Sequence, residues 1–187
     1  MENREKYRTR LLPHWDFGDV VQTITYRLGD SIPPTVYQQF LDLADLLPPE
    51  SQNRQKRQLI ENWIDAHRFG CCVLSNPIAA EIVIESWRFF DSKRYDLLHW
   101  AVMPNHVHLM IRQYKGFSLG DVVGGWKSYT SKEISKKLNV PNPLWHRGYW
   151  DRQIRDAEHY ARSRDYILNN PEKAGLMNWR FVSSKYK

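Results

Sequence analysis

The sequence predicts an α+β protein in which helices cover one side of an antiparallel sheet. Residues 19–28 alternate apolar and polar side chains, which is typical of a half-buried strand. Residues 94–103 and 106–112 are two further strand-like runs, and the turn-forming pair Pro104-Asn105 separates them. They therefore predict a β-hairpin. The remaining segments have apolar residues at helical spacing.

These helical segments can be placed in order along the chain. The predicted helices span residues 35–47, 54–67, 77–91, 118–138 and 156–169. Ser75 or Asn76 is expected to cap the third helix, with Pro77 in its first turn. Gly124-Gly125 is expected to interrupt the fourth helix, because glycine disfavours a helix interior.

The chain is expected to finish with a helix end and one more strand. Asn170-Pro171 and Gly175 are expected to close the last helix, and a short strand is expected around residues 180–182. The length of 187 residues suits a single domain over residues 1–187. Residues 30–93 then form a helical elaboration after the first strand.

Composition narrows the class of protein. The chain has no G-x-G-x-x-G, P-loop or G-x-S-x-G motif, which argues against a dinucleotide, nucleotide or α/β-hydrolase site. The only cysteines, Cys71 and Cys72, are adjacent and cannot build a disulfide framework, so a reducing cytoplasm is expected. We see no secretory signal and no apolar run of the roughly 18 residues that a membrane span needs. A soluble protein with no membrane partner is expected.

The positive charge is concentrated in one part of the chain. There are 27 Lys and Arg residues against 21 Asp and Glu, a formal net charge of +6. Residues 114–187 hold 14 basic and 7 acidic residues, so the whole excess lies there. Such a basic segment indicates a polyanion, nucleic acid first, and a solubilising charge excess is the alternative.

A pair of histidines carries the clearest chemical signal. His106 and His108 lie two residues apart in a predicted strand, so both point to one face, as a pair of metal ligands would. A third ligand must come from elsewhere. On the last predicted helix, Tyr166 and Asn170 are one turn apart and share a face. One could be a nucleophile and the other a ligand, or they could be a packing aromatic and a helix cap.

Longer motifs around these residues resemble a known family. VMPNHVHL at 102–109, GYWDRQIRD at 148–156 and DYILNNPEKAGL at 165–176 resemble the signature of single-tyrosine HUH transposases of the IS200-like superfamily. ITYRLGDSIP at 24–33 is similar to one branch, the REP-associated tyrosine transposases. The resemblance runs from about residue 15 to the end of the chain.

The resemblance implies a fold and a reaction. The fold is an RRM-like antiparallel sheet with helices packed on it, the HUH endonuclease fold. His106, His108 and Asn170 would bind a divalent metal, magnesium or manganese. Tyr166 would attack single-stranded DNA beside a hairpin or REP-like sequence, form a 5′-phosphotyrosyl intermediate and rejoin strands. A monomer is favoured over a homodimer, and such a protein would work at the nucleoid.

Cations interleaved with aromatic residues are expected to bind the DNA strand, because bases stack on rings while phosphates meet positive charge. The candidates are Lys127, Lys132, Arg147, Arg152, Arg155, Arg162, Trp145 and Tyr149. A solvated helix face and core packing are the alternatives for the lysines and the aromatics respectively.

Other functions use the same residues. The main alternative is a domesticated protein that binds hairpin DNA without cleaving it. A replication-initiator or relaxase-type nickase would share the chemistry, but those families order the motifs differently. A generic metal hydrolase requires Tyr166 to lie far from the two histidines.

Overall fold

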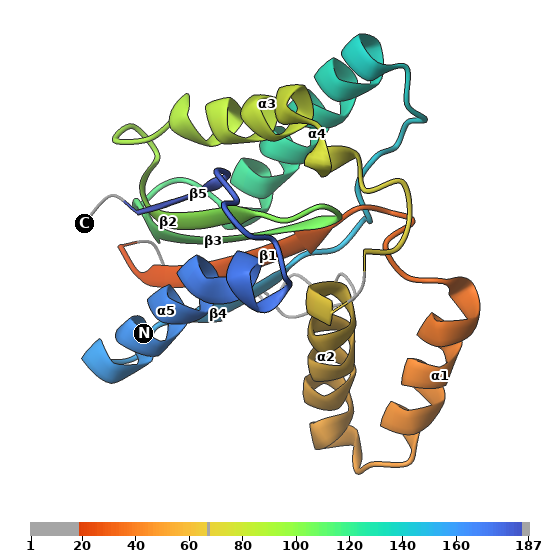
Figure 1. The fold of residues 1–187 in the computed structure, drawn as a ribbon. Coiled ribbons are helices and arrows are strands. Elements are labelled where there is room, and N and C mark those ends of the chain that lie inside the picture. Colours follow the sequence, from red (N-terminus) through yellow and green to blue (C-terminus); the bar gives the residue numbers. More distant parts are fainter. Residues whose placement is uncertain (1–18, 67, 185–187) are drawn as a thin grey trace.

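The computed structural model describes residues 19–66 and 68–184. Within these residues, five strands form one sheet in the order β4-β1-β3-β2-β5 (Figure 1). The strands are β1 (Val21–Arg27), β2 (Tyr95–Val102), β3 (His106–Gln113), β4 (Trp150–Gln153) and β5 (Val182–Ser184). Every pairing is antiparallel, as expected.

The predicted hairpin forms the middle of this sheet. β2 and β3 pair directly, and β1 lies along the other edge of β3. The register places Thr25 opposite His108 and Arg27 opposite His106. Both histidines therefore project from the central strand, on the same face.

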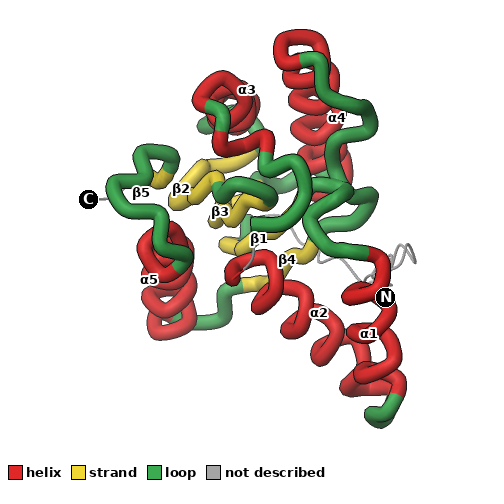
Figure 2. The backbone as a smooth tube through the Cα atoms, turned by 45° about the vertical axis from the view of Figure 1, so that its right-hand side comes forward, coloured by secondary structure: helices red, strands yellow, loops and turns green. Residues whose placement is uncertain are grey.

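Helices cover both faces of the sheet, so the expectation of one covered side was wrong. α3 (Pro77–Arg88) and α4 (Leu119–Leu138) pack on one face, while α5 (Ala157–Lys173) lies against the other (Figure 2). The reason lies in β3, where Val107 and Leu109 join the larger core and Met110 packs with Ile167 of α5. Apolar residues at both parities of a strand require cover on both sides.

The insertion after β1 is a pair of helices. α1 (Pro34–Asp45) and α2 (Pro49–Ala66) pack against each other around Phe40, Ile60 and Ile64, and project beyond the sheet (Figure 1). α2 begins five residues before the expected start, because Pro49 can occupy the first turn of a helix. His67, the last residue of the predicted helix, lies outside the described residues.

The structure confirms the predicted cap of one helix and contradicts the predicted break in another. Asn76 caps α3, and its side-chain oxygen accepts a hydrogen bond from the Ile78 backbone N–H. α4 runs without a break through Gly124-Gly125, since apolar residues on both sides of this pair anchor the helix in the core.

None of the described helices is both long and apolar enough to cross a membrane.

The last helix extends beyond its predicted end. α5 continues through Asn170 and Pro171 to Lys173, so Asn170 is not its C-cap. This continuation keeps the Asn170 side chain one turn beyond Tyr166 on a regular helix. The short strand β4 was not predicted from the sequence, because its four mostly polar residues show no clear alternation of apolar and polar side chains.

Buried aromatic residues join α3 and α4 to the sheet. The Trp87 indole N–H donates to the Tyr26 hydroxyl (2.8 Å), and the Trp126 indole N–H donates to the Tyr95 hydroxyl (2.9 Å). The Tyr95 hydroxyl donates to the Trp87 carbonyl (2.5 Å). All four side chains lie in the core.

Tyr26→Phe is expected to lower the free energy of unfolding by about 1–3 kcal/mol, because it leaves the buried Trp87 N–H without an acceptor. Tyr129→Phe removes the same hydroxyl from a side chain that is 53% exposed and is expected to change little. Urea unfolding of both variants checks this. Equal stability of the two would show that the buried bond is not needed.

Candidate metal centre and tyrosine site

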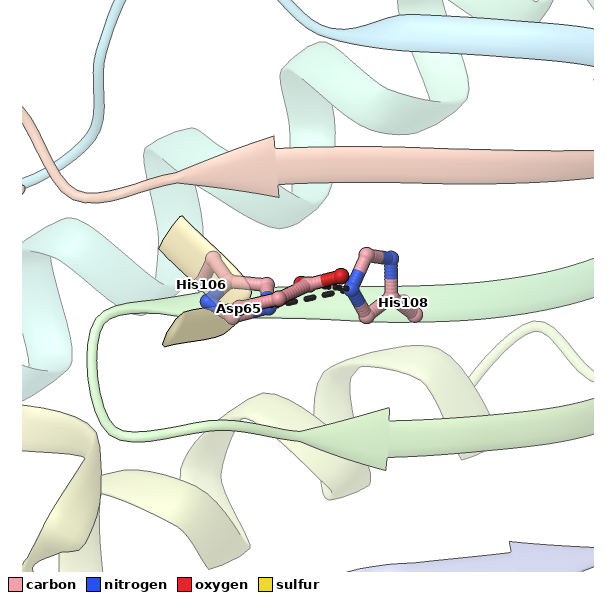
Figure 3. Close-up of side chains that lie close together, drawn as sticks. All are labelled: Asp65, His106 and His108. Atoms are coloured by element: carbon pink, nitrogen blue, oxygen red, sulfur yellow. Dashed lines mark hydrogen bonds and ion pairs between the residues drawn. The ribbon is translucent and has the colours of Figure 1, made fainter. Parts of the chain in front are cut away.

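The two histidines meet a carboxylate that comes from the inserted helix. Asp65 is the penultimate residue of α2, and its Oδ1 lies 3.0 Å from Nε2 of His106 and 3.1 Å from Nε2 of His108 (Figure 3). The donor atoms of the three residues all lie within 4.8 Å of one another. Both histidines are buried, while Asp65 is partly exposed.

Hydrogen bonds behind the imidazoles orient them. The Nδ1 of His106 lies 2.8 Å from Asn105 Oδ1, and that of His108 lies 2.9 Å from Thr25 Oγ1. The Asn105 amide also donates to the Phe69 carbonyl (3.2 Å), which turns its oxygen towards His106. The Asn105 oxygen can only accept, so it favours a proton on Nδ1 of His106 and leaves Nε2 available to a metal, whereas the Thr25 hydroxyl can donate or accept at His108. The two Nε2 atoms are 3.0 Å apart.

The charge state of His106 and Asp65 also suits a cation. Burial lowers the pKa of His106 to about 4, although its bond to Asp65 opposes this. Burial would raise the pKa of the Asp65 carboxyl, but its hydrogen bonds with both histidines lower it below its usual range. At neutral pH the site therefore presents a neutral His106 beside an ionised carboxylate. Imidazole and carboxylate together suit a divalent transition metal or magnesium.

Tyr166 lies at the edge of this cluster. Its ring is 5.1 Å from that of His108, and its hydroxyl donates to Asp65 Oδ2 (2.5 Å). Burial raises the pKa of the Tyr166 phenol, and the neighbouring Asp65 charge raises it further. The side chain is still 37% exposed, so a ligand can reach it. This position argues against the generic hydrolase, which requires a distant tyrosine.

Asn170 is buried one turn beyond Tyr166. Its side-chain oxygen has no hydrogen-bond partner within the described residues. Such an orphaned carbonyl oxygen fits a ligand position, since a buried acceptor is normally paired. The two imidazoles and the Asp65 carboxylate form a donor set that fits a divalent cation.

A hollow of about 710 Å³ opens beside these residues, between α2 and α5. Asp65, His108 and Tyr166 lie in its lining, together with Thr25 of β1. It also carries five arginines: Arg54, Arg57, Arg152, Arg155 and Arg162. Three of the predicted DNA contacts, Arg152, Arg155 and Arg162, are thus brought together here.

The other predicted DNA contacts lie elsewhere. Trp145 and Tyr149 are only 6% and 8% exposed and belong to the core, a correction to their predicted role in base stacking. The Trp145 ring packs edge-on against Tyr26, with centroids 4.7 Å apart. Both rings therefore pack in the core, which was the alternative to a role in DNA binding.

The predicted lysines and Arg147 also fall outside the hollow. Lys127 is held inside the fold, where its ammonium donates to three consecutive loop carbonyls beginning at His146. Burial lowers its pKa to about 8. Lys132 and Arg147 are exposed but do not line the hollow.

Asp65 is the site residue that sequence reasoning missed. It lies 41 residues before His106, in a segment without any metal-binding motif. A single acidic residue near the end of an amphipathic helix has no distinguishing pattern. Only the packing of α2 against the sheet brings it to the histidines.

Together, the fold and the site define an α+β protein with a candidate HUH-like metal site on the central strand and a tyrosine helix on the same face. The family model described as "Transposase IS200 like" matches residues 73–170, more than half of the chain. The chain therefore belongs to the IS200-like transposase family.

Two individual relatives match this chain at modest sequence identity. A REP-associated tyrosine transposase of Escherichia coli K12 is 26% identical over 91 residues, covering 46% of this chain and 53% of that protein. An uncharacterized protein of Haemophilus influenzae is 28% identical over 105 residues, covering 44% of this chain and 57% of that protein. The chain thus spans about half the length of the curated relatives it matches.

A solved structure shows the same fold. It is a REP-associated tyrosine transposase bound to a REP hairpin, with a TM-score of 0.55 and 15% identity. The similarity covers 93% of this chain and 82% of that one. The expected antiparallel sheet with packed helices is confirmed.

Proposed function

We propose that this chain is a metal-dependent endonuclease and strand transferase for single-stranded DNA. It cleaves beside a hairpin or REP-like sequence, forms a 5′-phosphotyrosyl intermediate and rejoins strands. One observation carries the proposal: the Asp65 carboxylate lies within hydrogen-bond distance of the Tyr166 hydroxyl and of both histidines, beside a hollow lined by arginines. Family membership supports the same reaction.

His106, His108 and Asp65 would hold the metal, manganese or magnesium, with Asn170 completing the set. A divalent ion at such a site supplies Lewis acidity to a phosphate oxygen and charge stabilisation in the transition state. Asn105 and Thr25 keep both imidazoles turned towards it, as outer partners of metal-binding histidines do.

Tyr166 is the nucleophile in this proposal. Its oxygen loses the phenol proton and forms a bond to the phosphorus, while the bond from phosphorus to the 3′ oxygen breaks. The 3′ oxygen takes up a proton, which gives a free 3′-OH and a 5′ end on the tyrosine. Asp65 accepts the phenol hydrogen bond and so fixes the direction of the attacking oxygen. Another 3′-OH can reverse the step, because the phosphodiester energy is kept in the tyrosyl link.

A single chain suffices for this chemistry. Tyr166 lies against the histidines of its own chain, whereas compact members of the superfamily exchange tyrosine helices between two copies. We therefore propose a monomer, with residues 1–187 as one domain. DNA as the substrate places its work at the nucleoid in the cytoplasm.

A denaturing gel tests the proposal. Hairpin oligonucleotides from the flanks of the gene, labelled at the 3′ end, are incubated with the protein and Mn²⁺ or Mg²⁺. We expect a covalent protein–DNA band that EDTA abolishes, while the same oligonucleotides labelled at the 5′ end release a shorter fragment. Tight hairpin binding without any cleaved product would overturn the proposal and favour the domesticated binding protein.

A further inference from the structure

One face of α2 is turned to the hollow. Arg54, Arg57, Glu61 and Asp65 recur at intervals of three or four residues and all line it. This interval places them in one stripe along the helix. A different face of α2, with Ile60, packs against α1. The inserted helix thus presents cations and a metal-site carboxylate on the same side.

Arginines from three directions converge on this hollow, and only Arg57 and Arg162 of them form an ion pair among the described residues. Among the described residues, the side chains of Arg54, Arg152 and Arg155 form no ion pair. Burial lowers the pKa of Arg152, and the positive charges of Arg57, Arg54 and Arg155 lower it further against the opposing charge of Glu61. Like charges held together in this way are relieved by an anion.

The two arginines of α2 differ in whether their side chains are held by other residues. Arg57 is fixed, since its Nε donates to Glu61 (2.8 Å) and a terminal nitrogen donates to the Asp151 carbonyl of β4 (3.1 Å). Arg54 is exposed and free to meet a ligand. From Arg54 to Asp65 the helix rises roughly 16 Å. Arg54 therefore lies too far from the reacting group to touch the scissile phosphate.

We infer that α2 is the second wall of the path taken by the single strand, with Arg54 and Arg57 holding phosphates beyond the scissile one, opposite the arginines of β4 and α5. The inference rests on the proposed function, because it takes the strand that Tyr166 attacks as the occupant. Recognition is through the backbone phosphates, so it is independent of base sequence. The hairpin stem stays outside the hollow.

Equilibrium binding in EDTA tests this wall apart from cleavage. The probe is a fluorescent hairpin oligonucleotide with a single-stranded extension, followed by anisotropy. Arg54→Gln is expected to weaken binding about fivefold or more at low salt, and to reduce the slope of log K against log salt by about 0.7. Arg54→Lys keeps the charge and should keep most of the affinity.

Arg180→Gln is the matched control. It removes one positive charge from an exposed side chain that pairs with Glu81 of α3, across the sheet from the hollow. We expect the binding affinity to change less than twofold, because a distant surface charge is screened by salt and contributes little. Equal effects of Arg54→Gln and Arg180→Gln would overturn the inference. So would an equal loss by Arg54→Gln on a blunt hairpin without the extension, which would make α2 a duplex contact.

Different results would contradict the proposed cleavage and the proposed role of α2. A loss of binding in Arg54→Gln, with no covalent product from wild type, supports the wall and contradicts the cleavage. A covalent product from wild type, with unchanged binding by Arg54→Gln, supports the cleavage and contradicts the wall.

Discussion

Replacing Tyr166 by phenylalanine is expected to abolish the covalent protein–DNA product. The substitution removes the attacking oxygen and one hydrogen bond to Asp65, and leaves the ring in place beside His108. Loss of a nucleophile of this kind lowers the rate by about a thousandfold or more. A denaturing gel with the labelled hairpin substrate measures this directly.

Tyr160→Phe provides a control on the same helix. Tyr160 lies six residues before Tyr166, and its hydroxyl contacts His99 (2.7 Å) rather than the candidate metal ligands His106 and His108. This variant should still form the product. Cleavage that survives Tyr166→Phe would assign the attack to water and contradict the tyrosine mechanism.

The second large effect is expected from Asp65→Asn. The amide keeps the shape of the side chain but removes the only negative charge beside His106 and His108 in the described cluster. We expect Mn²⁺ affinity to fall about 10- to 100-fold, the scale seen when metal-site partners are lost. Isothermal titration calorimetry measures the affinity, and the yield of covalent DNA product should fall with it.

Glu50→Gln controls for the loss of charge. Glu50 lies exposed in the first turn of the same helix, far from the site along α2. It should bind Mn²⁺ like wild type. If Asp65→Asn also binds normally while Asn170→Ala does not, the third ligand is Asn170 as the family resemblance implies, and Asp65 serves the tyrosine alone.

The central sheet could be predicted because its signals are local. Alternation in β1 and the turn at Pro104-Asn105 are properties of short segments, and strand geometry alone puts His106 and His108 on one face. The helix carrying Tyr166 was likewise evident from its periodicity. The structure confirms the antiparallel sheet and the presence of this helix.

The rest depends on packing between distant segments. Asp65 joins the site because α2 docks against the sheet, and no motif marks it. Pro171 suggested a helix end, yet tertiary contacts of Ile167 and its neighbours carry α5 past it. Trp145 looked suited to base stacking, because burial of an aromatic residue cannot be read from its immediate neighbours.

Mass spectrometry of the protein–DNA product tests the central claim most directly. The product formed with Mn²⁺ is digested with nuclease and trypsin, and the modified peptide is sequenced. We expect a 5′-linked nucleotide on Tyr166 and on no other residue. A nucleotide on a different side chain, or cleaved DNA without any modified peptide, would contradict the site described here.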